Sequence, residues 1–82
     1  NKLVQGGSDL LKTAKAWAHE LAKRPTLALG VTKEDMFYAM GHDLYDTIAY
    51  EAEKQVATFG SSDFKEGVNA FLEKRPAKFT GK

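Results

Sequence analysis

Cysteine is absent from this 82-residue sequence. Neither a disulfide framework nor a thiolate zinc site can therefore support a small core, and the composition fits a reducing compartment such as the cytoplasm. No apolar run approaches the roughly 20 residues that span a bilayer, so a membrane is not an expected partner. A strong net charge is also missing, because 12 basic and 11 acidic residues leave only +1. The large positive excess of a dedicated nucleic-acid-binding protein is not there, which argues against nucleic acid as a partner.

Apolar residues instead recur at helical spacing in four successive stretches, which predicts an all-α fold of about four amphipathic helices. We expect residues 1–7 to be the end of a strand or a linker, because a pair of glycines closes them. Residues 8–82 are expected to form one helical domain. Ser8 is placed to cap the first helix, and Pro25 is placed to end it.

The start of the second helix has two interpretations. Thr32 and Asp35 are spaced like a capping box, which would begin a helix at Thr32. Alternatively one helix runs from about Thr26, with Pro25 in its first turn and Gly30 tolerated inside it. We prefer the second interpretation, because small and bulky apolar residues then continue along the whole stretch.

The third and fourth helices carry clearer boundary signals. Asp43 can cap the third, and Gly60 is placed to end it in the left-handed conformation. Ser61 or Ser62 can cap the fourth. Gly67 interrupts good helix-forming sequence, so we expect another backbone or a ligand to approach closely there.

Candidate catalytic and metal sites are few. His19-Glu20 begins like the zinc-protease helix signature, but Lys23 stands where the second histidine is needed. His42 beside Asp43 is more typical of a loop histidine next to a helix cap than of a catalytic dyad, because no serine or cysteine nucleophile has a recognisable context. We therefore assign no catalytic residue and no metal ligand.

A cluster of cations follows the fourth helix and consists of Lys74, Arg75, Lys78 and Lys82. A solvated helix end whose charges complement the helix dipole explains it adequately. An anion site is the functional alternative, because lysine and arginine donate several N–H groups to phosphate oxygens. Phe71 lies three residues before Lys74, on the same side of a continuing helix. The ring could therefore stack on a nucleotide base while the ammonium binds a phosphate or a ring nitrogen. The tip beyond the helix is expected to extend outward as an arm.

The same stretch resembles a known signature. Residues 63–68 read DFKEGV, residues 70–75 read AFLEKR, and residues 79–81 read FTG. This text is similar to the C-terminal signature of the enoyl-CoA hydratase/isomerase (crotonase) superfamily. The resemblance covers essentially the whole chain, but only about the last third of a family member. One departure is that Pro76 directly follows Arg75, where the family often has one residue between them.

The resemblance implies a fold and a function. The chain would be the C-terminal helical, trimer-forming part of a crotonase fold without its spiral core. Family members bind acyl-CoA thioesters and stabilise an enolate-like intermediate in an oxyanion hole of backbone N–H groups. Those groups and the acid/base carboxylates lie in the core, so the fragment alone is expected to be inactive. Coenzyme A enters as part of the substrate, and no separate cofactor is expected.

The resemblance also implies partners and contact residues. Phe71 and Lys74 match the positions at which the family's signature helix reaches the adenine end of CoA from a neighbouring subunit. The parent protein would be a trimer or hexamer, and the isolated fragment would associate with itself. The alternative is a free-standing small helical module that binds acyl-CoA or only oligomerises. A first residue other than methionine, Asn1, favours a piece of a longer polypeptide over that alternative.

Overall fold

A computed structural model describes residues 2–82. These residues form four helices and no strand: α1 (Gly7–Ala22), α2 (Thr26–Ala39), α3 (Leu44–Phe59) and α4 (Ser62–Leu72). The prediction of an all-α fold with four helices is confirmed. Residues 2–5 carry no regular secondary structure, Gly7 already belongs to α1, and Asn1 lies outside the described residues.

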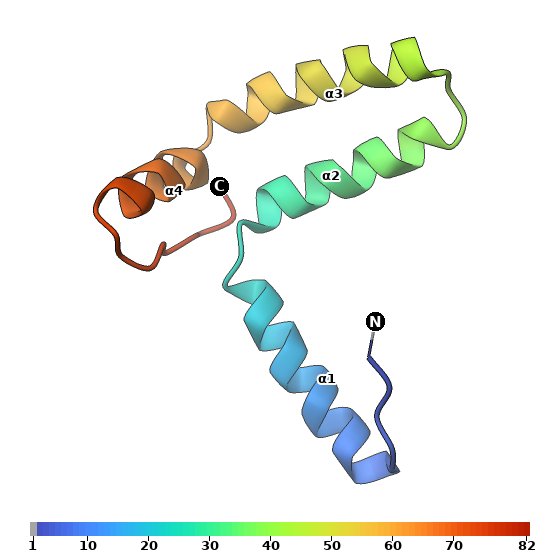
Figure 1. Cartoon of the computed structure of the whole chain (residues 1–82), viewed down its shortest axis with the longest axis vertical. Helices are drawn as coiled ribbons and strands as arrows, with labels where there is room; N and C mark the ends of the chain where they lie inside the picture. The colour runs from blue at the N-terminus through green and yellow to red at the C-terminus, as the bar shows by residue number, and fades with distance from the viewer. Residues whose placement is uncertain (1) are drawn as a thin grey trace.

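Helices α2 and α3 run antiparallel as a hairpin, α4 lies at the far end of α3, and α1 points away from the other three (Figure 1). Aromatic stacking holds the hairpin together near its turn. The ring of Tyr38 lies between those of His42 and Tyr50, with centroid distances of 3.6 and 4.0 Å. The ammonium of Lys54 in α3 forms an ion pair with the carboxylate of Glu34 in α2, with an N···O distance of 2.9 Å. His42 is therefore a stacking residue of the hairpin turn rather than part of a catalytic dyad.

Several helix boundaries agree with the sequence signals. α2 begins at Thr26, as preferred, and the Thr32 hydroxyl lies inside the helix, where it donates to the carbonyl of Ala28 at 3.0 Å. The Asp43 carboxylate caps α3 by accepting from the backbone N–H of Asp46 at 2.9 Å. The Asp43 side chain thus starts α3 where a free backbone N–H group needs a partner.

One predicted boundary and one predicted conformation are wrong. Gly6 rather than Ser8 precedes the first helix, and it has a φ of 91° and no side-chain cap. A glycine enters that conformation without steric cost, so the helix starts two residues earlier than a serine cap would allow. Gly60 ends α3 as predicted, but its φ of −73° is not left-handed. The left-handed residue after a helix is instead Lys74, with a φ of 52°.

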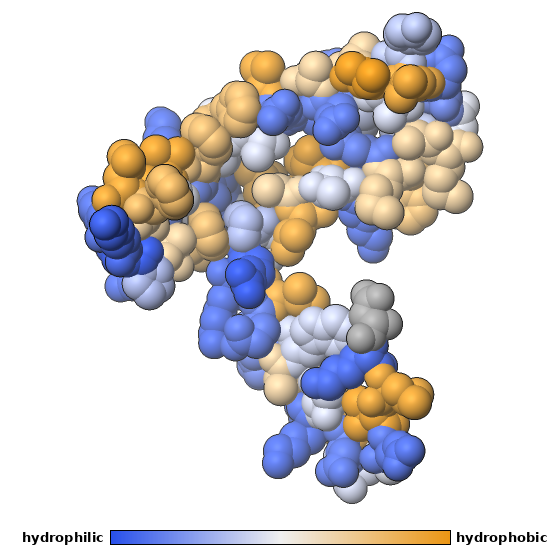
Figure 2. Space-filling model, viewed as in Figure 1, coloured by the Kyte–Doolittle hydropathy of each residue, from blue (hydrophilic) through white to orange (hydrophobic). Residues whose placement is uncertain are grey.

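The described residues enclose almost no core. Only Ala70 and Asp63 are buried, at 2% and 4% exposure. The accessible surface is 6925 Å², against about 4900 Å² expected for a compact 9.1 kDa monomer. The radius of gyration is 16.4 Å, where a compact domain of this length has about 12 Å. Apolar side chains therefore lie on the surface over several helices (Figure 2).

None of the helices in the described range is both long and apolar enough to cross a bilayer. The excess of accessible surface over a compact monomer, about 2000 Å², is comparable to the area buried in a stable protein–protein interface. An exposed apolar surface of this size is typical of one that another protein, or another part of the same protein, covers.

Candidate functional site

Both ends of α4 are capped. At its start, Ser61 rather than Ser62 accepts the backbone N–H of Phe64 at 3.0 Å, which resolves the choice between the two serines. At its end, the N–H of Arg75 bonds the carbonyl of Ala70 at 3.0 Å, and the N–H of Lys74 bonds that of Phe71 at 3.3 Å. This pair of bonds is the Schellman motif, in which the residue in the position of Lys74 is left-handed.

The return segment, residues 76–82, folds back along α4 (Figure 1). The carboxylate of Asp63 accepts the backbone N–H groups of Thr80 at 2.7 Å and of Gly81 at 2.8 Å. In the opposite direction, the carbonyl of Lys82 accepts from the N–H of Asp63 at 2.9 Å and from the hydroxyl of Ser62 at 2.6 Å. The prediction of an arm extending outward is wrong, because the first turn of α4 offers a buried carboxylate to the two amides.

A second carboxylate, one turn further along α4, binds the start of the same segment. Glu66 receives both terminal nitrogens of Arg75, at 2.6 and 3.0 Å. Glu66 Oε1 also accepts the backbone N–H of Lys78 at 2.8 Å. The remaining guanidinium nitrogen of Arg75, Nε, donates to Glu73 at 2.5 Å. We call Glu66, Glu73, Arg75 and the Lys78 amide the Glu66 cluster.

These contacts shift the acid–base equilibria of both α4 carboxylates. The backbone N–H of Thr80 is the main cause that lowers the pKa of Asp63 below its ordinary value. The hydrogen bonds from Arg75 lower the pKa of Glu66 to about 2. The same interactions, first with Glu66 and then with Glu73, raise the pKa of Arg75. The two carboxylates are consequently charged throughout the physiological pH range.

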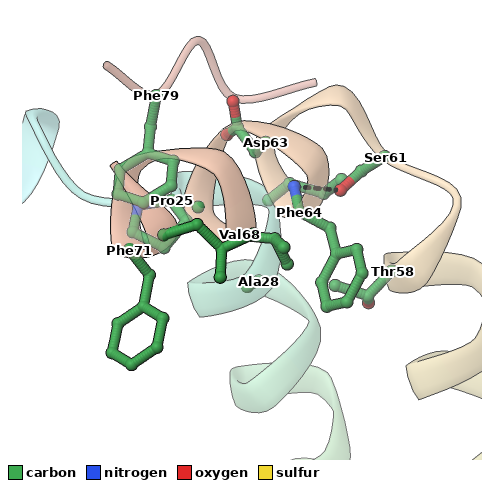
Figure 3. Close-up of a pocket in the computed structure, with 12 residues that line it drawn as sticks. Pro25, Ala28, Thr58, Ser61, Asp63, Phe64, Val68, Phe71 and Phe79 are labelled. Carbon is green, nitrogen blue, oxygen red and sulfur yellow. Dashed lines mark hydrogen bonds between the residues drawn. The ribbon is translucent and has the colours of Figure 1, made fainter. Parts of the chain in front are cut away.

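An apolar groove of about 380 Å³ lies beside α4. Its walls come from α2 and the proline before it, the end of α3, α4 and the return segment, and include Pro25, Leu27, Phe64, Val68, Leu72 and Phe79. Phe64 packs its ring on that of Phe59 in α3, with centroids 4.8 Å apart. Figure 3 shows Phe71 at the edge of the groove, with its ring directed away from those of Phe64 and Phe79.

Two glycines admit close contacts with the return segment. A Cβ at Gly67 would lie 3.5 Å from the ring of Phe79. Within the described residues, the close approach predicted at Gly67 is therefore made by a side chain and not by another stretch of backbone. Gly81 has a φ of 78°, and a Cβ there would lie 2.7 Å from the Thr26 hydroxyl. The return segment therefore contacts the start of α2 as well as α4.

The predicted cation cluster is divided by the fold. Arg75 is bound to two carboxylates, whereas Lys74, Lys78 and Lys82 form no ion pair with any other residue of the described chain. Lys74 follows the end of α4, so the helical spacing used to place it beside Phe71 does not apply. Phe71 is 82% exposed, and Lys74 is exposed as well. Phe71, which lies in α4, and Lys74, which follows the helix, are thus both accessible to a ligand.

Sequence reasoning missed the roles of Asp63 and Glu66. From the sequence alone, both are acidic residues near the start of a helix, which indicates only a favourable interaction with the helix dipole. Their partners lie up to 18 residues away, and no periodic pattern connects them. The one available signal was that both residues belong to the text resembling the family signature.

Within residues 2–82 no group of three or more histidine, aspartate or glutamate side chains is arranged to hold a metal ion. The arrangement at the end of α4 instead offers an exposed aromatic ring, a lysine that forms no ion pair with residues 2–82, and a fixed turn. Such a combination suits a ligand with an aromatic base and an anionic group.

Comparison with known proteins gives the chain a family. Residues 1–82 match the enoyl-CoA hydratase/isomerase family. The chain is 40% identical over 79 residues to the 1,2-epoxyphenylacetyl-CoA isomerase of Escherichia coli, which covers 96% of this chain and 30% of that protein. It is 35% identical over 82 residues to the crotonyl-CoA hydratase of Syntrophomonas wolfei, which covers all of this chain and 31% of the relative.

The fold agrees with these relatives. A crystal structure of an enoyl-CoA hydratase from Geobacillus kaustophilus superposes with a TM-score of 0.84 and 33% identity, over 92% of this chain and 28% of that one. The chain thus spans about 30% of the length of the relatives it matches. It belongs to the enoyl-CoA hydratase/isomerase family.

Proposed function

We propose that this chain acts as part of an acyl-CoA hydratase or isomerase of the length of its relatives. The observation that carries the proposal is the match of all 82 residues to the family, together with relatives that are named as a CoA-thioester isomerase and a CoA-thioester hydratase. Within that enzyme the chain contributes an oligomerisation surface and part of the CoA site. It contributes no catalytic residue, and alone it is inactive.

The CoA contacts of this proposal are Phe71 and Lys74. The exposed ring of Phe71 offers a face on which an adenine can stack, a contact of about 1–3 kcal/mol per base. The ammonium of Lys74 is available for a phosphate oxygen or a ring nitrogen, because it forms no ion pair within residues 2–82. Arg75, by contrast, is not assigned a ligand, since two carboxylates already bind it.

The oligomerisation surface consists of the apolar helix faces. α1 has no buried residue, yet it presents Leu10, Leu11, Trp17 and Leu21 at 44–61% exposure. In α2, apolar side chains project in several directions, as in helices that are covered on more than one side. We assign these faces to contacts with the rest of a longer chain and with other copies of the enzyme. A free-standing module of this size is disfavoured, because Ala70 is the one buried apolar residue among residues 2–82.

Kinetics of the complete enzyme test the CoA assignment. Phe71→Ala and Lys74→Ala should each raise KM for acyl-CoA about tenfold and change kcat little, because contacts to adenine are remote from the reacting bond. Glu53→Gln, at an exposed residue outside the proposed CoA site and without an ion pair in residues 2–82, serves as the control. Unchanged KM in both variants would contradict the assignment.

Sedimentation tests the surface assignment. The 82-residue chain alone should associate with itself in a concentration-dependent manner, since its apolar faces are uncovered. A compact monomer at high concentration would contradict this part of the proposal.

A further inference from the structure

Lys74 is the one residue other than glycine with a positive φ in the described part of the chain. The left-handed conformation brings the Cβ of an L-residue too close to the carbonyl that follows, and glycine avoids that contact. A turn selected for stability alone would therefore carry glycine at this position. Lysine stands there, and its side chain is exposed and free of ion pairs within residues 2–82.

The residues on both sides of Lys74 are fixed by one guanidinium. Arg75 places Nη1 and Nη2 on Glu66 and Nε on Glu73, so both edges of the planar group are occupied. A guanidinium bound along two edges cannot rotate without breaking several charge-assisted hydrogen bonds. The backbone of Lys74 is thereby held between two neighbours that are themselves bonded to each other.

Glu66 also closes the turn on its far side. Its Oε1 accepts the N–H of Lys78 at 2.8 Å, two residues after Pro76, whose ring fixes φ. One carboxylate on α4 thus ties together the residue after Lys74 and the start of the return segment. The turn is a closed loop, and Lys74 is one of its exposed residues.

We infer that Glu66 is a positioning residue for coenzyme A binding, which acts through Lys74 by holding Arg75 and the Lys78 amide. This inference rests on the proposed function, because it needs Lys74 to contact CoA. It differs from that proposal in assigning a role to a residue that touches no ligand. Without the Glu66 bond, the turn would sample other conformations, and the lysine ammonium would spend less time near the anion.

A double-mutant cycle on the complete enzyme tests the inference, with the dissociation constant for free CoA measured by calorimetry. Lys74→Ala should weaken CoA binding about tenfold through the lost charge-assisted contact. Glu66→Gln keeps the side-chain shape and removes the charge, and should weaken binding about fivefold. In the Lys74→Ala background, Glu66→Gln should have no further effect, because the residue it positions is gone.

Controls separate positioning from loss of the fold. Glu53→Gln, an exposed glutamate of α3 without an ion pair in the described residues, should leave CoA binding unchanged. Circular dichroism and thermal melting show whether each variant folds. If Glu66→Gln does not fold, Glu73→Gln replaces it, since that change releases only the Nε side of Arg75 and should weaken CoA binding in the same direction by a smaller factor.

Each outcome decides a different question. Equal weakening by Glu66→Gln with and without Lys74, or no weakening in the presence of Lys74, overturns the inference and leaves the CoA role of Lys74 in place. Wild-type CoA affinity in Lys74→Ala overturns that role, and the inference with it.

Discussion

The two ends of this chain are stabilised in different ways. α4 and the return segment are bonded to each other by two carboxylates, and the two buried residues of the described chain, Asp63 and Ala70, are both in α4. α1 has no buried residue and no extensive contact with another helix in residues 2–82. Figure 1 shows it pointing away from the rest of the molecule.

The difference indicates where each part obtains its structure. The C-terminal end carries its own hydrogen-bond partners, so its conformation is set locally and is available to present a ligand-binding side chain. α1 has a well-defined apolar side but no extensive contact with another helix of the described chain. Most helical stability in proteins comes from such packing, so α1 depends on contacts made by other protein parts.

Acid should affect the C-terminal end most strongly. The pKa of Glu66 is lowered from 4.5 to about 2, and that of Asp63 is lowered from 3.8. A carboxylate with a lowered pKa stabilises the fold above its ordinary pKa, and this stabilisation disappears as the pH falls toward the lowered value. The return segment should therefore remain bound at pH 5 and detach as the pH falls from about 4.5 to 2.

NMR spectra of the amide groups follow this transition directly. The N–H signals of Lys78, Thr80 and Gly81 should move toward unfolded positions together, while those of α1 should change little. Bound signals that persist well below pH 2 would show that the carboxylates do not hold the segment.

Asp63→Asn should have the next largest effect. The asparagine keeps the shape but loses the charge that binds two backbone N–H groups in a buried position, and one of its two terminal groups is a donor that faces donors. Amide exchange at Thr80 and Gly81 should accelerate at least about tenfold at neutral pH. Asp46→Asn, in the first turn of α3, is the matched control and should leave these amides protected.

The sequence predicted those parts of the fold that depend on neighbouring residues. Helix positions follow from apolar spacing, and the caps at Asp43 and Ser61 follow from short polar side chains before that spacing. The start of α1 was missed because Gly6 reaches a positive φ that needs no side chain. The C-terminal resemblance correctly identified the family.

The return segment could not be predicted in the same way. Its path depends on hydrogen bonds that the carboxylates of Asp63 and Glu66 accept from amides lying 12 to 18 residues further along the chain. Backbone amides have no sequence signal, since every residue except proline carries one. For the candidate site, Phe71 and Lys74 remain predictions. The structure adds that carboxylates already bind Arg75, and that Lys74 follows the helix in the left-handed conformation.

The smallest expected effect is a gain in stability. Lys74→Gly removes the Cβ from a left-handed residue and should stabilise the turn by about 1 kcal/mol. Lys33→Gly, inside α2, is the opposite control and should destabilise by about 1 kcal/mol, because glycine is a poor helix former. Urea unfolding of both variants measures the two changes.

The same Lys74→Gly variant should bind CoA about as weakly as Lys74→Ala. A variant that is more stable than the natural sequence and yet weaker in binding would mean that the lysine is present for its side chain rather than for its backbone. A loss of stability on Lys74→Gly would instead mean that the side chain contributes contacts to the turn that outweigh its left-handed conformation. In that case the C-terminal end would resemble α1 more closely, because its conformation too would depend on packing rather than on backbone hydrogen bonds.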